Sequence, residues 1–305
     1  MTLSRRRFFS LASASCLIAP VAQAFQWQGT ALGARARIIL DHPNAEQITE
    51  RSLAEINRLE DIFSLYRSNS EISRLNATGH LSAPSFELLE CLSIARHAHG
   101  LTEGRFDPTV QPLWRVLADA FTAGRPVDAA DMTDARARIG FKRVSFGSEG
   151  VKLSKGQQLT LNGIAQGYIA DRIALLMRGE GVKDVLIDTG EILAMGAPHG
   201  RAAWPVTIVG EISARALTGR AIATSSPFGT TLNASGQIGH ILDPRGGEGF
   251  ESDIRQVSVS ANSAAFADAV STGLCAASDA NEARRLLRND NDAVLESVQT
   301  AAKSI

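Results

Sequence analysis

The sequence is poor in cysteine, lacks long apolar runs and carries no excess of charge of one sign. Only 3 of its 305 residues are cysteine, too few for a structural zinc site built on four thiolates. No run reaches the about 18 apolar residues of a membrane-spanning helix, so we expect no span in the mature chain. Lys and Arg number 31 against 32 Asp and Glu, with no basic stretch beyond the first ten residues. This balance argues against nucleic-acid binding.

The amino terminus is typical of an export signal. Residues 1–24 read MTLSRRRFFSLASASCLIAPVAQA, a charged start followed by an apolar stretch too short for a bilayer and a small-x-small ending. The run SRRRFF resembles the twin-arginine signal, with an ordinary secretory signal as the alternative. We therefore expect residues 1–24 to be a cleaved signal peptide outside the fold. Residues 25–305 should then form a single domain in the periplasm.

Two cysteines remain after this cleavage, Cys91 and Cys275. An oxidising periplasm would allow them to form a disulfide. Both, however, lie on patterns typical of apolar helix faces, which favours buried free thiols.

The pattern of apolar residues in the mature chain changes near residue 141. Before it, apolar residues recur with a helical period, as at Ile48, Ile56 and Leu59, and after it short strands predominate. This order predicts an α+β fold rather than a doubly wound α/β fold. Expected helices cover residues 44–63, 84–100, 109–121, 131–139, 162–178, 264–277 and 281–287. Expected strands cover 27–40 (interrupted at Gly33), 143–146, 151–153, 158–161, 184–188, 192–195, 205–209, 221–224, 237–242, 257–261 and 293–298.

Three stretches carry candidate chemistry, and each has a purely structural alternative. In NGIAQGY, residues 162–168, two glycines open a helix whose N–H groups can face a phosphate, or they only make a tight turn. Asp268, Ser271 and Thr272 share one helix face and offer oxygens that suit Mg²⁺, unless Thr272 merely bonds back to its own helix. His240 precedes an Asp-Pro corner that can hold a base, or it is solvated beside an Asx turn.

Two further stretches also have two interpretations. Asp107 precedes Pro108 and is a good start for a helix, so capping alone can explain it. Tyr66 can stack on a ligand ring or pack in an ordinary way.

Taken together and in order, five stretches resemble the FAD:protein FMN transferase family, known as ApbE. They are FSLYRSNSEISRLN, GRFDPTVQPLW, TLNGIAQGYIADR with DVLIDTGEILAMG, GHILDPRGG and SVSANSAAFADAVSTGL, and they span nearly the whole mature chain. The resemblance implies a two-lobed α+β fold, with mixed or antiparallel sheets, flanking helices and a flavin groove between the lobes. It implies an enzyme that attaches FMN from FAD to a Thr or Ser of an acceptor protein, releases AMP and requires Mg²⁺.

The resemblance also implies roles for particular residues. His240 would be the base for the acceptor hydroxyl. The metal would be held by Asp268, Ser271, Thr272 and the backbone carbonyl of Gly163. The FAD groove would be lined by Gln28, Tyr66, Arg105, Phe106, Asp107, Thr160, Gln166 and Leu242.

Several positions depart from the family pattern. Thr160 and Ser271 stand where many members have an acid, Gln166 replaces a Lys or Glu, Gln28 a Met, and Thr189-Gly190 a Gly-Gly. The thinner set of acids motivates two rival hypotheses, a periplasmic FAD-binding carrier without catalysis and an FAD pyrophosphatase that gives FMN and AMP. With the twin-arginine start, LNGIAQGYIADR resembles the branch linked to nitrous oxide respiration, whose acceptor is a membrane-bound FMN-binding protein.

Overall fold

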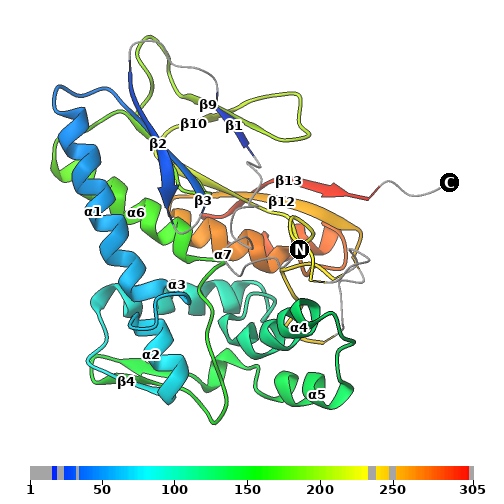
Figure 1. Ribbon diagram of the computed structural model, residues 1–305. Coiled ribbons are helices and arrows are strands. Elements are labelled where there is room, and N and C mark those ends of the chain that lie inside the picture. Colours follow the sequence, from blue (N-terminus) through cyan, green and yellow to red (C-terminus); the bar gives the residue numbers. More distant parts are fainter. Residues whose placement is uncertain (1–15, 19–23, 32–33, 233–237, 247–251, 302–305) are drawn as a thin grey trace.

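The framework of the structure, a computed structural model, is a seven-stranded antiparallel sheet with the strand order β13-β12-β11-β8-β7-β3-β2. The structure describes residues 16–18, 24–31, 34–232, 238–246 and 252–301. Helices α6 (Ala165–Gly179) and α7 (Ala264–Leu274) cover one face of this sheet (Figure 1). The small sheet β1-β9-β10 packs on the other face. Both faces of the central strands are therefore buried.

The alternation of side chains explains this layering. Successive residues of a strand point to opposite faces, so Ile38 of β3 joins the core under the helices while Ile39 faces the small sheet. The apolar cluster between the two sheets, here called the inter-sheet cluster, contains Ile39, Leu186, Ile192, Ala194, Trp204, Val206, Ile208, Leu217 and Ile222.

A helical lobe lies below the large sheet in the view of Figure 1, with α2 beside strand β4 of a third, small sheet, β4-β6-β5, and with α4 and α5 packed on each other at the right. The strands are β1 (Cys16–Ile18), β2 (Phe25–Ala31), β3 (Ala34–Leu40), β4 (His80–Ser82), β5 (Ser145–Gly147), β6 (Gly150–Lys152), β7 (Val185–Asp188), β8 (Ile192–Met195), β9 (Trp204–Ile208), β10 (Arg215–Leu217), β11 (Arg220–Ser225), β12 (Ile254–Ala261) and β13 (Val294–Thr300). The remaining α-helices are α1 (Ala45–Phe63), α2 (Glu71–Thr78), α3 (Phe86–Leu101), α4 (Gln111–Ala123), α5 (Ala129–Ala137) and α8 (Ala280–Leu287).

Helices α6 and α7 touch through their backbones. A Cβ atom on Gly167 of α6 would collide with the carbonyl of Ala264 and lie 2.7 Å from the nitrogen of Ala265. One turn later, Asp171 accepts hydrogen bonds from the Ala264 and Ala265 nitrogens, at 2.8 and 3.0 Å, and from the Ser263 hydroxyl at 2.7 Å. An acidic side chain on orphan N–H groups stabilises a helix start. The start of α7 is thus fixed by one glycine and one aspartate of α6.

The α+β class and the expected helices are confirmed, with boundaries shifted by a few residues. Helix α6 begins at Ala165 rather than at residue 162, because the nitrogens of Ile164 and Ala165 both bond to the carbonyl of Leu161 and make a turn first. Helix α7 ends at Leu274 rather than at residue 277. Three short strands were not expected: β1, β4 and β10.

Three expected strands were wrong. Residues 27–40 form a hairpin of β2 and β3, because a reversal between Ala31 and Ala34 leaves the alternating pattern unchanged. Residues 158–161 are extended but unpaired, since the Leu159 nitrogen bonds to the Asn76 side chain and the Thr160 nitrogen to the Pro108 carbonyl. The third expected strand covered residues 237–242, of which the structure describes 238–242. Among these, only Gly239 pairs, in a bridge with Thr231.

Part of the expected export signal also forms structure. Residues 16–18 are strand β1, which pairs with β9, so the expectation that the whole of residues 1–24 lies outside the fold is wrong for this segment. Residues 1–15 and 19–23 lie outside the described residues.

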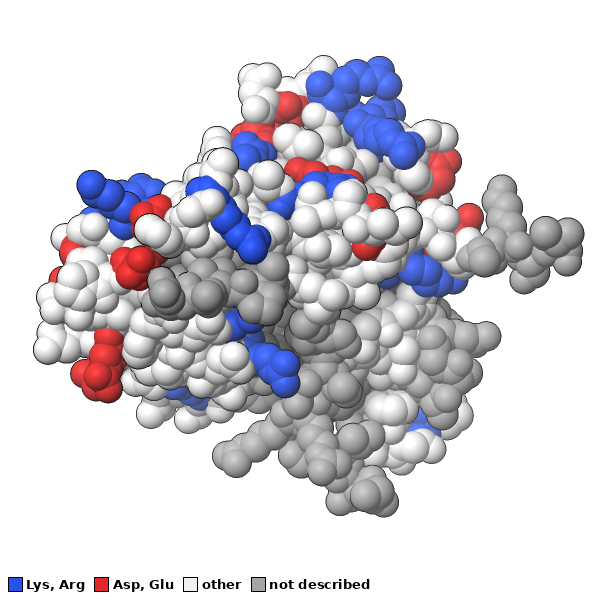
Figure 2. Space-filling view, turned by 90° about the horizontal axis from the view of Figure 1, so that it is seen from above, with Lys and Arg blue, Asp and Glu red and all other residues white. Residues whose placement is uncertain are grey.

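The expectation drawn from the cysteine patterns agrees with the structure. Cys91 and Cys275 are free and buried, as the apolar helix patterns favoured. Acidic and basic side chains are interspersed on the face shown in Figure 2. Among the described residues, no helix is long and apolar enough to cross a membrane.

The contact at Gly167 predicts a strong effect of a single methyl group. Gly167→Ala should destabilise the protein by about 1–3 kcal/mol or displace α7, because the added carbon meets backbone that cannot rotate away. Gly179→Ala, in the same helix with nothing within 4 Å, is the matched control and should be neutral or up to about 1 kcal/mol stabilising. Urea unfolding of the two variants measures the difference. Equal midpoints would contradict the proposed role of the α6–α7 contact.

Candidate functional site

The first part of the site lies where α7 passes the start of α6. Asp268 is buried, and its Oδ2 accepts a long hydrogen bond of 3.4 Å from the Gly167 nitrogen. One turn later, Thr272 is half-buried and lies against Gly163, where a Cβ atom would be 3.0 Å from the Thr272 hydroxyl oxygen. The structure therefore brings together Gly163, Asp268 and Thr272, as the sequence predicted.

Ser271 has a different environment from Thr272. Its hydroxyl is fully buried, donates to the carbonyl of Asp268 at 3.0 Å and shares a 2.8 Å hydrogen bond with Ser225 at the end of β11. Ser225 also lies 3.2 Å from the Thr272 hydroxyl. These bonds tie α7 to the sheet and give Ser271 a positioning role, whereas its predicted role as a metal ligand stays a prediction.

The acids of this region are held in an environment that disfavours their charge. Burial raises the pKa of Asp268 to about 8, with the nearby Asp171 adding to the shift and the Gly167 N–H opposing it. Burial also raises the pKa of Glu191 well above its usual range, and the Asp268 charge adds to it. The Glu191 Oε2 accepts from the Thr224 nitrogen at 3.1 Å. A bound cation would relieve the cost of two neighbouring buried carboxyls.

The donor chemistry fits a hard cation such as Mg²⁺. Carboxylate, hydroxyl and backbone carbonyl oxygens are its preferred ligands, and Asp268, Thr272 and Gly163 supply one of each. The described residues contain no group of three or more His, Cys, Asp or Glu side chains that could hold a metal. A site with a single carboxylate leaves room for water and substrate oxygens, which is how Mg²⁺ is usually held.

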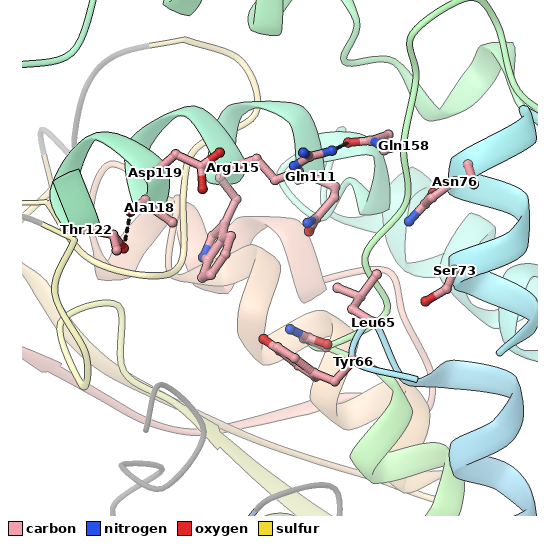
Figure 3. Close-up of a pocket in the computed structure, with 13 residues that line it drawn as sticks. Leu65, Tyr66, Ser73, Asn76, Gln111, Arg115, Ala118, Asp119, Thr122 and Gln158 are labelled. Atoms are coloured by element: carbon pink, nitrogen blue, oxygen red, sulfur yellow. Dashed lines mark hydrogen bonds between the residues drawn. The ribbon is translucent and has the colours of Figure 1, made fainter. Parts of the chain in front are cut away.

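The second part of the site is a groove between α4 and the loops around Tyr66 and residue 158 (Figure 3). Its volume is about 390 Å³, within the usual range for small-molecule sites. The Tyr66 ring is 52% exposed and points into the groove. Arg115 bonds to Gln158 at 3.1 Å across one end. The lining residues are Leu65, Tyr66, Ser73, Asn76, Ala77, Gln111, Trp114, Arg115, Ala118, Asp119, Thr122, Gln158 and Asn162.

One loop connects the groove to the first part of the site, the pocket around Asp268, Thr272 and Gly163, here called the acid pocket. Gln158 and Asn162 line the groove, while Gly163, the next residue, lies against Thr272. Between them, Thr160 is fixed by its backbone bond of 2.8 Å to Pro108, and its hydroxyl accepts from the Asn162 nitrogen at 3.3 Å. A ligand that extends along this loop would reach both parts of the site.

The segment 105–107 is held mainly by the protein itself. Phe106 is buried against α7, where a Cβ on Gly273 would lie 2.9 Å from it. The Asp107 carboxylate caps the turn at Pro108 by accepting from the Thr109 nitrogen at 2.8 Å, and it also accepts from the Phe141 nitrogen at 3.0 Å. The capping interpretation of Asp107 is thus confirmed.

Arg105 is buried in a network of charges. Its guanidinium pairs with Glu282 at 2.5 Å and Glu103 at 3.3 Å, and its Nε has no partner among the described residues. These ion pairs link the segment 105–107 to α8. Contacts of this segment with a flavin stay a prediction.

The other predicted groove residues lie in separate places. The Gln166 side chain lies against Gly190, where the φ of +109° favours glycine and an added Cβ would be about 3.0 Å from the Gln166 amide. Leu242 packs on the apolar cluster of α4 and α5. Gln28 is exposed on the edge strand β2 and is not among the residues that line the groove.

His240 lies in a loop that starts at Ser226, directly after Ser225, which contacts Thr272. Its Nδ1 is 3.2 Å from the Thr230 carbonyl and 3.3 Å from the Thr230 nitrogen. Burial lowers the pKa of His240, and the carbonyls of Thr230 and Pro227 oppose this shift only in part. The expected Asx turn follows, since the Arg245 nitrogen bonds to Asp243 at 3.0 Å. The His240 ring is thus a neutral, held imidazole rather than a freely solvated one.

Sequence reasoning missed two residues that shape the site, Asp171 and Glu191, and it treated Gly167 only as part of the helix start and not as a contact with α7. The spacing of four between Gly167 and Asp171 placed them on one helix face and could have indicated a contact with another helix. Glu191 gave no such signal, because its burial depends on pairing between strands far apart in sequence.

Comparisons with known proteins agree with this arrangement. A model described as the ApbE family matches residues 30–295. The chain is 30% identical over 255 residues to an FAD:protein FMN transferase of Vibrio cholerae, covering 77% of this chain and 74% of that protein. It is 28% identical over 236 residues to one of Klebsiella pneumoniae, covering 70% of each.

Solved structures show the same fold. The apo form of the Pseudomonas stutzeri flavinyl transferase ApbE superposes with a TM-score of 0.79 at 24% identity, covering 93% of this chain and 95% of that one. The ApbE protein of Thermotoga maritima also gives a TM-score of 0.79 at 24% identity, covering 92% and 97%.

The raised pKa of Asp268 predicts how stability depends on pH in the metal-free protein. Between about pH 4 and pH 8 the folded protein binds a proton on Asp268 that the unfolded chain has lost, so stability should fall as pH rises. Asp268→Asn should flatten this dependence, whereas Thr272→Val, which removes no titrating group, should keep it. Urea unfolding with a chelator at pH 5 and pH 8 measures both. The same pH dependence in wild type and Asp268→Asn would rule out this assignment.

Proposed function

This chain belongs to the ApbE family, and from that premise we propose that it is an FAD:protein FMN transferase that uses Mg²⁺ and releases AMP. The observation that carries the proposal is the loop 158–163. It joins a groove lined by aromatic rings to the acid pocket, where the Asp268 carboxylate, the Thr272 hydroxyl and the Gly163 backbone lie. A dinucleotide such as FAD has the same two parts, a large ring and a pyrophosphate.

The acid pocket would receive the pyrophosphate. Mg²⁺ held by Asp268, Thr272 and the Gly163 carbonyl would supply neutralisation of the phosphate charge. The Gly167 N–H at the start of α6 points to the same place, since it donates to Asp268 at 3.4 Å, and such a donor favours anionic oxygens. Asp171 and Gly167 act indirectly. They fix the position of α7 relative to α6, and with it the position of Asp268.

The groove would receive the flavin ring. Tyr66 and Trp114 both line it, and aromatic side chains bind a planar ring by stacking and by edge contacts. Gln111 and Gln158 offer amide groups that can recognise the polar edge of such a ring, whereas the Asn76 amide is bonded to the Leu159 backbone.

His240 would be the base. With the Nδ1 proton donated to the Thr230 carbonyl, the Nε2 lone pair is left to accept the proton of the acceptor hydroxyl. The hydroxyl oxygen then bonds to the phosphorus of the FMN half, the bond from that phosphorus to the bridging oxygen breaks, and AMP leaves with the electron pair. The lowered pKa of His240 keeps the ring neutral and ready for this role at pH 7.

We propose the periplasm as the location and an FMN-binding protein as the acceptor. The export signal of residues 1–24 supports the location. The resemblance of LNGIAQGYIADR to the branch linked to nitrous oxide respiration supports a membrane-bound acceptor of that process.

The activity is tested by following the mass of the acceptor. Residues 25–305 are mixed with FAD, Mg²⁺ and a periplasmic FMN-acceptor domain, with His240→Ala and Asp268→Asn in parallel. We expect the acceptor to gain the mass of FMN and AMP to appear. His240→Ala should bind FAD normally yet transfer about 10²–10⁴-fold more slowly, because it loses general-base catalysis. Asp268→Asn should lose both Mg²⁺ affinity and turnover.

The matched control is His199→Ala, which removes an exposed histidine outside the site and should transfer at the wild-type rate. Tight FAD binding with no mass gain on any acceptor would instead identify a flavin carrier. FMN and AMP released without an acceptor would identify a pyrophosphatase.

The lowered pKa of His240 also predicts the pH profile of transfer. The base must be neutral, so the rate should hold from pH 8 down to about 6.5, the ordinary pKa of histidine, and fall only at lower pH. A rate that already halves near pH 7 would show that the group which titrates is not this buried imidazole. Single-turnover kinetics with saturating FAD and acceptor measure the profile.

A further inference from the structure

The outer edge of β9 is occupied by the chain's own amino-terminal segment. Strand β1 pairs with it antiparallel, with Cys16 opposite Ile208, Leu17 opposite Thr207 and Ile18 opposite Val206. The other edge of β9 pairs with β10. Among the described residues, β1 is the only partner of the outer edge, and β1 lies within the segment expected to be cleaved after residue 24.

The fit of β1 shows what this edge accepts. The Cys16 side chain packs on the inter-sheet cluster, and its sulfur lies 3.6 Å from the Thr224 hydroxyl. Leu17 points the other way and is 61% exposed. Burial raises the pKa of Cys16 to about 11, as expected for a seated thiol. The edge therefore accepts an extended segment that has a small side chain facing the inter-sheet cluster. The next side chain faces solvent, so its size and polarity are not restricted.

The part of the edge that β1 occupies carries no charge against such pairing. Exposed strands usually bear a charge or a proline that prevents another strand from adding. Strand β9 reads WPVTI; it has no charged residue, and Pro205 lies outside the three residues that pair with β1. An uncharged edge is a ready surface for strand addition, in which the backbone supplies affinity and alternate side chains supply specificity.

The edge and the candidate site lie on opposite faces of the large sheet and come together at the end of β11. Thr224, which touches Cys16, binds the Glu191 carboxylate through its nitrogen at 3.1 Å. The next residue, Ser225, touches Thr272 at 3.2 Å. A strand on β9 is thus separated from the acid pocket by one strand end.

We propose that the outer edge of β9 is the docking strand for the FMN-acceptor protein. An extended segment of the acceptor pairs with it in the mature enzyme, and residues 16–18 occupy the same edge before the export signal is removed. The uncleaved chain is therefore blocked toward its acceptor but not toward FAD. This inference rests on the proposed function and on removal of residues 1–24.

A disulfide lock tests the proposal in the full chain. Directly opposed residues of antiparallel strands have Cα separations within the range of a disulfide, so Ile208→Cys can be oxidised onto Cys16. We expect the oxidised form to bind the acceptor at least about tenfold more weakly than the reduced form, with FAD affinity unchanged. Calorimetry of acceptor binding without FAD gives this result independently of catalysis. Cys16→Ser with Ile208→Cys is the control, since it alters β9 equally but cannot be locked.

A second measurement uses the mature chain. A synthetic peptide of residues 12–24 should compete with the acceptor for residues 25–305, and a scrambled peptide should not. Equal acceptor affinity in the locked and reduced forms, or no competition by the peptide, would overturn the docking proposal. If no FMN is transferred but the lock still weakens acceptor binding, the proposed activity is overturned and the docking proposal is retained.

Discussion

The close approach of α6 and α7 at Gly167 determines the geometry of the rest of the molecule. Backbone meets backbone there, so the spacing of the two helices cannot adjust by side-chain rotation. Asp171 then holds the first turn of α7 by three hydrogen bonds, and Gly273 lets the other end of α7 lie against Phe106. The acids, the hydroxyls and the segment 105–107 all take their positions from a helix fixed at both ends.

This rigidity has an electrostatic cost. Asp268 and Glu191 are buried and Asp171 is half-buried. The charge of Asp171 acts on Asp268 and that of Asp268 acts on Glu191, and burial raises the pKa of each. Such clusters are stable only when protonated, hydrogen-bonded or neutralised by a cation. Asp171 is satisfied by the start of α7, whereas Asp268 has one long bond from Gly167, which is why Asp268 is the carboxylate left for a ligand.

Much of this arrangement could be predicted from the sequence. Helical periodicity located α1, α3 and α4, and the spacing of Asp268 and Thr272 placed them on one helix face. Patterning could not show that residues 27–40 reverse into a hairpin, because alternation is the same in one strand or two. It also could not show that residues 158–161 use the Asn76 side chain and the Pro108 carbonyl in place of a strand partner. Both failures concern hydrogen bonds of the backbone, and the order of apolar and polar side chains does not show which partner a backbone group has.

The two buried thiols have a consequence for the life of the molecule. Cys91 lies inside α3 and Cys275 directly after the last residue of α7, and burial raises the pKa of both far above neutrality, so neither forms the reactive thiolate. With no cross-link to make, the chain needs no oxidant or isomerase to reach its native state. Its covalent structure is the same in a reducing and in an oxidising compartment, so it can complete its core on one side of a membrane and keep it on the other.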